Sequence, residues 1–281
     1  MGQDAESFVA KAKELPVMPP VAAEVMKKAE DPETDLKSIS TLISRDAALA
    51  VRVLKIANSS FYSMPRRIDS IQQAIVLLGY STLRSVVVAA AIKDVFSRFG
   101  LAERLLWEHG VAGGVGAALL AQQVGGIARE EAFVGGLVHD IGKLVIYSQA
   151  QADYQKVLTA VYSEEKDSVS AETEVFGFDH TQVGRLVLHK WRLPESLAAA
   201  VGAHHDLERA GSVDGARPLA AVLMVADRLC LREGIGRRKS APELDPFACP
   251  GGELLGLTGS DIDELAGRFV ETYEEERKLF G

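Results

Sequence analysis

The stretch AFVGGLVHDIGKLVIY, residues 132–147, decides the fold class, because it is apolar over most of its length and no proline interrupts it. We predict one helix over residues 130–148. Asp46, Ser70 and Asp179 are predicted N-caps, and Gly79 is a predicted helix end. Apolar residues at helical spacing predict further helices over residues 21–29, 36–43, 47–60, 71–79, 81–99, 105–124, 180–191 and 218–231, and from Pro194 onward. No segment alternates polar and apolar residues between hairpin turns, so the predicted fold class is all-α.

Outward from this stretch, the chain divides into two predicted helical parts and a tail. We expect an N-terminal helical bundle over residues 10–100 and a second bundle over residues 101–231. All six histidines follow Phe99-Gly100, which places the boundary near that pair. The first bundle therefore carries none of the histidine chemistry.

The tail, residues 232–281, has a different composition. Six glycines and three prolines fall within residues 232–259, which predicts a long loop. Ser260 and Asp263 have the spacing of a capping box, and they predict the start of a last amphipathic helix.

Composition and charge exclude several classes of protein. Lys plus Arg total 31 against 39 Asp plus Glu, a net charge of −8, which argues against a nucleic-acid binder. Apolar runs such as Val86 to Ile92 are far shorter than the ~20 residues of a membrane helix. The start MGQDAES is not a secretory signal, and Glu6 breaks the myristoylation pattern. Two cysteines, Cys230 and Cys249, suit a reducing compartment, so we expect a cytoplasmic protein without nucleic-acid or membrane partners.

Histidines and aspartates in a fixed order point to a metal site. His139 and Asp140 are adjacent, and helical neighbours point about 100° apart, so their side chains can converge on one ion or bridge two. Five of the six histidines join two aspartates in this candidate set: His109, His139, Asp140, His180, His204, His205 and Asp227. Such ligands suit Fe, Mn or Zn. A single buried histidine is more often a hydrogen-bonded core residue, whereas the ordered set favours one or two divalent ions.

Two further residues bear on this site. Lys143 follows Asp140 by three positions and shares its helical face, where it could hold a phosphate oxygen. His189, in RLVLHKWRLP, is expected at the surface or in packing, outside the set.

At these residues the chain resembles the HD superfamily of metal-dependent phosphohydrolases, and within it the HDOD proteins. The resemblance extends to about Leu231 and rests on LPVMPPVAAEVM, ISRDAALAVRVLKIANSSFY, SIQQAIVLLG, AFVGGLVHDIGKLVI and FGFDHTQVGRLVLHKWRLPESLAAAVGAHHD, with Ala226-Asp227. It implies an all-helical fold in which an N-terminal bundle packs on an HD-like bundle. It also implies a role in bacterial signalling, in a family that generally has no assigned catalytic activity.

The resemblance to the catalytic HD-GYP phosphodiesterases is incomplete. The seven candidate ligands match metal-holding positions of that branch, and Lys143 matches its HDxxK lysine. No GYP triplet follows His204-His205, which argues against hydrolysis of cyclic di-GMP. Residue 105, four before His109, is Leu rather than Glu, so two metals are the expected maximum.

Two functions from different classes remain. The preferred one is a non-catalytic regulatory or output module that acts on signalling proteins in trans and could bind a nucleotide. The alternative is a metal-dependent phosphohydrolase acting on a nucleotide or cyclic dinucleotide, in which Asp140 bridges the metals and Lys143 takes the phosphate. A site without metal is a third possibility. The candidate partner surfaces, Arg66-Arg67 and Arg237-Arg238-Lys239, are more simply explained as solvated charge clusters.

Overall fold

The computed structural model describes residues 4–280, apart from 13–14, 16–17, 30–33, 60–61, 63–65, 97–100, 237–238 and 260–261. Within these ranges every regular element is a helix, and no strand is present. The predicted all-α fold is confirmed. The proposed boundary at Phe99-Gly100, as well as Arg237-Arg238 and Ser260, lie outside the described residues.

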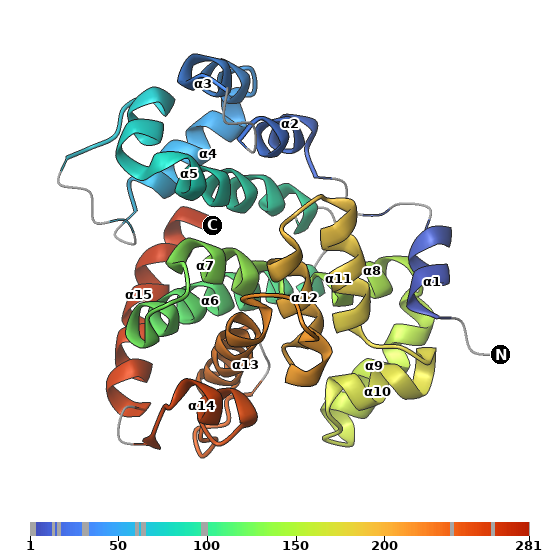
Figure 1. Cartoon of the computed structure of the whole chain (residues 1–281). Helices are drawn as coiled ribbons and strands as arrows, with labels where there is room; N and C mark the ends of the chain where they lie inside the picture. Colours follow the sequence, from blue (N-terminus) through green and yellow to red (C-terminus); the bar gives the residue numbers. More distant parts are fainter. Residues whose placement is uncertain are drawn as a thin grey trace.

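The N-terminal part forms an upper layer of helices (Figure 1). It contains α2 (Pro20–Ala29), α3 (Leu36–Ser44), α4 (Ala47–Ala57) and α5 (Ile71–Phe96), whereas α1 (Ala5–Lys11) packs on α11 in the other layer. Asp46 caps α4 as predicted, since its carboxylate accepts a hydrogen bond from the Leu49 N–H at 3.0 Å. At Gly79 the backbone takes φ +79°, and the helix axis bends by 118° between residues 71–80 and 82–93. The predicted helix end is therefore a sharp kink.

Asn58 closes the loop that joins α4 to α5. Its side-chain amide donates to the Leu54 carbonyl at 2.8 Å and to the Ile68 carbonyl at 2.7 Å, and its oxygen accepts from the Ile68 N–H at 2.7 Å. These three bonds fix the two ends of the loop to each other. Arg66 and Arg67 lie exposed near the end of this loop, where Arg67 forms an ion pair with Asp69.

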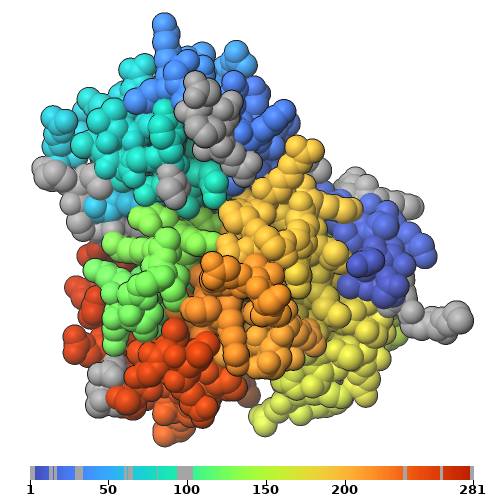
Figure 2. Space-filling view, in the orientation of Figure 1, coloured from blue at the N-terminus to red at the C-terminus, as the bar shows by residue number. Residues whose placement is uncertain are grey.

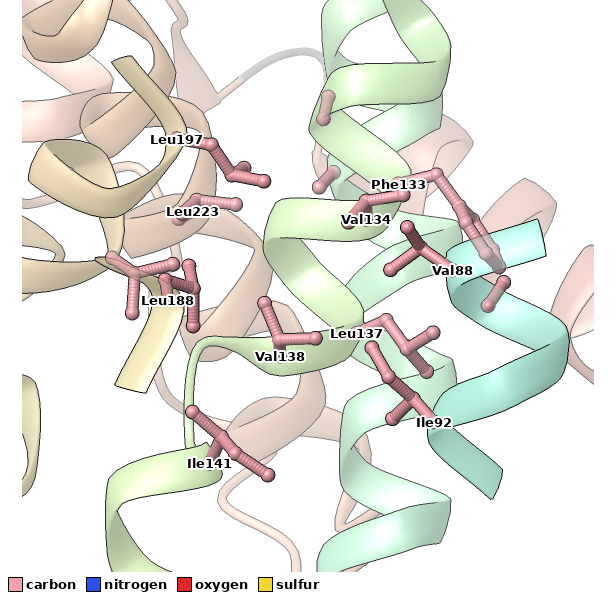
Figure 3. Packing of buried hydrophobic residues seen from close by; sticks show 14 of the residues in the cluster. Val88, Ile92, Phe133, Val134, Leu137, Val138, Ile141, Leu188, Leu197 and Leu223 are labelled. Carbon is pink, nitrogen blue, oxygen red and sulfur yellow. The ribbon is translucent and has the colours of Figure 1, made fainter. Parts of the chain in front are cut away.

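The second layer holds the histidines. Its elements are α6 (Leu101–Val124), α7 (Arg129–Val138), α8 (Ile141–Gln149), α9 (Gln151–Ser163), α10 (Ser168–Phe176), α11 (His180–Lys190), α12 (Glu195–Ala203), a 3-10 helix (Leu207–Ala210) and α13 (Ala216–Glu233). The second part of α5 packs on α7, where Val88 and Ile92 lie against Leu137 (Figure 3). In space-filling view the cyan surface of the N-terminal layer lies directly against the green surface of the second layer (Figure 2). Helices α9 and α10 were not predicted, because their apolar periodicity is weak.

The prediction of one helix over residues 130–148 is wrong. The chain leaves the helix between Val138 and Ile141 (Figure 3), and Asp140 has φ −97° and ψ 10°. The cause is two close contacts with different neighbours. A Cβ on Gly136 would lie 2.2 Å from the Gly113 carbonyl oxygen of α6, and a Cβ on Gly142 would lie 2.0 Å from the His180 carbonyl oxygen of α11. One straight helix cannot follow both neighbours, so the chain turns at His139-Asp140.

The tail differs in part from its prediction. The expected long loop over residues 232–259 is interrupted by α14 (Pro250–Leu255). Pro250 occupies the first turn, where no N–H is needed, and Cys249 accepts a weak hydrogen bond from the Gly252 N–H. The predicted amphipathic helix is α15 (Ile262–Phe280), which buries Phe269 and Tyr273 and packs on α6.

No single helix in the described ranges has the length and apolarity needed to cross a membrane. Only the kinked pair of segments 71–80 and 82–93 passes such a test when the two are taken together. Val86 to Ile92, in the second of these segments, are buried inside the protein.

Candidate metal centre

The predicted ligands come from five places in the second layer and meet at one point. His109 lies on α6, and Asp227 lies on α13, which packs against it. His139 and Asp140 occupy the turn between α7 and α8. The other three are His180, the first residue of α11, and His204-His205, which follow α12.

The first group of ligand atoms belongs to His109, His139 and Asp227, which are all buried. The Nε2 atoms of His109 and His139 are 3.3 Å apart. Asp227 Oδ1 lies 3.0 Å from His109 Nε2 and 3.9 Å from His139 Nε2. These atoms lie within the span of a single ion's coordination shell.

The second group belongs to His180, His204 and His205. The Nε2 atoms of His180 and His204 are 3.4 Å apart, and both residues are fully buried. His205 is exposed to solvent on one side, and its ring centroid lies 4.2 Å from that of His204. This group therefore has one open side.

Asp140 lies between the two groups and faces each with a different oxygen. Its Oδ2 is 3.6 Å from the Nε2 atoms of both His109 and His139. Its Oδ1 is 3.3 Å from His180 Nε2 and 4.0 Å from His204 Nε2. Oδ1 is buried and has no hydrogen-bond partner among the described residues, and a buried carboxylate oxygen without one is costly. A cation beside Oδ1 would remove that cost.

The outer nitrogen of each buried histidine faces an oxygen acceptor. The Nδ1 atoms of His109, His139 and His204 lie 3.2, 2.6 and 2.7 Å from the carbonyl oxygens of Ile235, Gly136 and Val201. His180 Nδ1 lies 2.6 Å from Glu172 Oε2. Because these oxygens only accept hydrogen bonds, the Nδ1–H tautomer satisfies each of them. In that tautomer Nε2 presents its lone pair to the centre, which is the form that binds metals. His109 Nε2 also lies 3.0 Å from an acceptor, Asp227 Oδ1, and a cation between these two atoms would satisfy both.

Electrostatics also favour a cation at this point. Burial lowers the pKa of His139 and lowers that of His204 well below its usual value, which keeps both rings neutral at pH 7. Burial alone would raise the pKa of Asp140, but Lys143, with Nζ 2.7 Å from Oδ2, holds that pKa well below its usual range. The close packing around the His205 ring lowers its pKa to about 4, although the residue keeps contact with solvent. Neutral imidazoles and ionised carboxylates are the forms that divalent ions require.

Glu172, on α10, is a site residue that the sequence did not reveal. Its carboxylate is fully buried and accepts hydrogen bonds from His180 N–H at 2.7 Å, His180 Nδ1 at 2.6 Å and the Tyr154 hydroxyl at 3.0 Å. A carboxylate behind a ligating histidine is a common way to orient the ring. The available sequence signal was weak: an acidic residue inside an otherwise mixed helix, eight positions before a candidate ligand.

The remaining predicted residues are placed as follows. Lys143 points to Asp140 rather than outward, and 12% of its side chain is exposed. His189 lies outside the cluster and forms an ion pair with Glu195 at 3.1 Å. Asp179 caps α11 in a capping box with Gln182, and Arg209 binds the Asp179 carboxylate at 2.6 Å. These contacts fix the start of the helix that carries His180.

A cavity of about 510 Å³ borders the open side at His205. Asp206, Glu208 and Glu253 line it, with Arg217 as the basic lining residue. Arg217 is bound to Glu208 at 2.7 Å. The approach to the centre from this cavity is therefore acidic.

The chain is similar to several known proteins. A family model described as "HDOD domain" matches residues 15–207. An HDOD domain protein of unknown function from Geobacter sulfurreducens has a crystal structure that is 27% identical, with a TM-score of 0.76, over 95% of this chain and 96% of that one. A structure from Shewanella amazonensis SB2B, 24% identical over 98% of each chain with a TM-score of 0.74, shares the fold. An uncharacterised protein from Treponema pallidum is 26% identical over 73% of this chain, which spans 40% of that protein.

Proposed function

The chain belongs to the HDOD family, and on that premise we propose that it is a non-catalytic output module of signal transduction whose HD-like half binds one or two divalent metal ions. One observation carries the metal site. Four histidine Nε2 atoms and the unpartnered Asp140 Oδ1 converge on one buried point that contains no cation other than the Lys143 ammonium in the described residues.

The charge at the centre supports the same proposal. Asp140, Asp227 and Glu172 bring three buried carboxylates to the centre and its surroundings, whereas the described residues supply one ammonium there, that of Lys143, which leaves two negative charges. Buried charges of one sign are unfavourable unless they are neutralised. One divalent ion would balance them, and a second would leave positive charge for an anionic ligand. Imidazole and carboxylate ligands suit Fe, Mn or Zn.

Two features favour regulation over catalysis. Lys143, the residue that would contact a phosphate, is held by Asp140 at 2.7 Å and is mostly covered. The cavity beside His205 is lined by three acidic residues, and this repels polyanions such as nucleotides.

The partners in this proposal are signalling proteins that contact the helical surface in trans, with a nucleotide as a further ligand to be tested. The net charge of −8 argues against nucleic acid.

A metal-dependent phosphohydrolase is the second candidate, favoured by the position of Asp140 between the two ligand groups. Two bound divalent ions would supply Lewis-acid activation of water. Asp140 would hold both ions through its two oxygens, and the histidines would complete their ligand sets. Lys143 would have to turn from Asp140 toward a phosphate oxygen of a nucleotide or cyclic dinucleotide.

Elemental analysis of the purified protein, alone and after loading with Fe, Mn or Zn, tests the proposal. His139→Ala removes a central ligand, and His189→Ala is the matched control because that histidine lies outside the cluster. We expect one or two equivalents of metal in the wild type and the control, and fewer in His139→Ala. Metal-free wild type after loading would overturn the proposed site. Turnover of bis(p-nitrophenyl) phosphate that disappears in His139→Ala would replace the regulatory function with the enzymatic one.

A further inference from the structure

A second cavity lies far along α11 from the metal centre, where the two layers of the molecule meet. It measures about 550 Å³ and is formed by α2, the C-terminal end of α11 and residues just before α2. We propose that this cavity binds a small amphipathic anion, with an aromatic or aliphatic body and one carboxylate, sulfonate or phosphate group. Its volume is in the range of pockets that hold small molecules.

The floor of this cavity is apolar. Met18, Met26, Val187 and Trp191 line it and are buried in the fold. Methionine side chains adapt to ligands of different shape, and an indole ring offers a flat face to an aromatic body. The apolar part of a ligand would therefore contact thioether and indole groups from both layers.

The rim of the cavity is basic. Among the residues that the structure describes, Lys27, Lys190 and Arg192 line it together with one acidic residue, Glu24. All four are exposed, so their charged groups can reach a ligand. Three cations against one anion is the reverse of the balance in the whole chain, which carries a net charge of −8. An anionic group on the ligand would pair with these cations, whereas a neutral amphiphile would not.

Arg192 occupies its place in a backbone conformation that favours glycine. Its φ is +56°, just after α11 ends, and its N–H donates to the His189 carbonyl at 3.0 Å. An arginine here is strained, so glycine can replace it without harm to the backbone. Arg192→Gly is therefore a suitable test variant, because it removes one cation from the cavity rim and also relieves the backbone strain.

The location gives such a ligand contact with both layers. Helix α2 belongs to the N-terminal layer, whereas α11 begins at His180 in the metal centre and ends at Lys190 on the cavity rim. A molecule bound between them would bridge the two layers. Its binding does not depend on metal at the centre, so the proposal stands or fails separately from the proposed function.

Titration of the whole chain with 8-anilinonaphthalene-1-sulfonate, followed by dye fluorescence, tests the proposal. Ala23 lines the cavity and is exposed, so Ala23→Trp should fill the cavity without disturbing the core. Ala152→Trp, at an exposed position of α9 outside the lining, is the matched control. We expect Ala23→Trp to abolish saturable binding and Ala152→Trp to leave it unchanged. Arg192→Gly should weaken binding by about tenfold, as for one lost hydrogen bond to a charged group.

The charge requirement is tested with a pair of competitors of equal length. Decanoate should displace the dye from the wild type, and decanol at the same concentration should not. Equal displacement by both would overturn the anionic ligand, and equal dye binding by Ala23→Trp and Ala152→Trp would overturn the site. If Ala23→Trp lowers the unfolding temperature, Arg192→Gly decides, since unchanged affinity in that variant also contradicts the proposal.

Discussion

Glu172→Gln should weaken metal binding at the group formed by His180, His204 and His205. The carboxylate accepts two hydrogen bonds from His180, through its backbone N–H and its Nδ1, at 2.7 and 2.6 Å. These bonds hold the ring so that Nε2 points toward Asp140 Oδ1, 3.3 Å away. Glutamine keeps the shape and one accepting oxygen for His180, loses the negative charge, and replaces the oxygen that accepts from the Tyr154 hydroxyl with an NH2 donor.

The expected magnitude follows from the type of contact. Loss of a group that orients a ligating histidine costs about 10–100-fold in metal affinity, or roughly 1.4–2.7 kcal/mol. Tyr154→Phe removes the single hydrogen bond to Glu172 Oε1, which is 3.0 Å long, and keeps the charge. Its effect on metal affinity should be smaller, at about fivefold. A hydrogen bond to a charged group contributes roughly 1.5 kcal/mol, and this bond acts on the ligand His180 only indirectly, through Glu172.

The assay is calorimetric titration of metal-free protein with Zn²⁺ in the presence of a competing chelator. The group formed by His109, His139 and Asp227 has no hydrogen bond to Glu172, so its affinity is an internal reference. An affinity of the group formed by His180, His204 and His205 that is the same in Glu172→Gln as in the wild type would refute the orienting role. Equal losses at both groups would show that the variant disturbs the fold rather than one ligand.

Three further predictions concern the scaffold. Asn58→Ala should lower the free energy of unfolding by about 2 kcal/mol in urea titration, because it breaks the bonds to both backbone groups of Ile68; an unchanged midpoint would contradict this. Gly136→Ala should cost about 3 kcal/mol or prevent folding, measured by thermal unfolding, since the added Cβ would lie 2.2 Å from an α6 carbonyl oxygen. The Ser38 N–H holds the pKa of Asp35 below its usual 3.8, so the charged carboxylate stabilises the fold above about pH 4 and loses this effect as pH falls through the folded-state pKa. The stability difference between wild type and Asp35→Asn should therefore shrink on acidification from pH 6 to pH 3; a pH-independent difference would refute it.

The sequence was sufficient for the fold class and for choosing the seven histidines and aspartates that the fold brings together. Helix ends were predictable where a single residue caps the helix or favours a positive φ, as the Asp46 and Asp179 caps and the Gly79 kink show. The break at His139-Asp140 was not, because the residues there continue the helical pattern. It arises from contacts of Gly136 and Gly142 with two separate helices, which no local pattern contains.

Glu172 was missed for a related reason. Its role depends on two partners, Tyr154 and His180, that come from other segments, and a buried glutamate looks like any surface glutamate in the sequence. The histidines could be found because their residue type is rare and their order is informative. The orientation of each ring depends on carbonyl groups such as that of Ile235, whose position only the folded backbone defines.

The paired glycine contacts hold two pairs of helices together around the centre. Backbone lies directly on backbone between α6 and α7 and again between α8 and α11, so each pair forms one closely packed body. The ligands of the first group belong to one body, with Asp227 on α13 beside it, and His180 belongs to the other. The two bodies are joined in the chain by His139-Asp140 itself. The turn between the two bodies therefore contains the shared ligand, so an ion held by Asp140 would add a further link between them, beside the packing of α12 on α7 and α11.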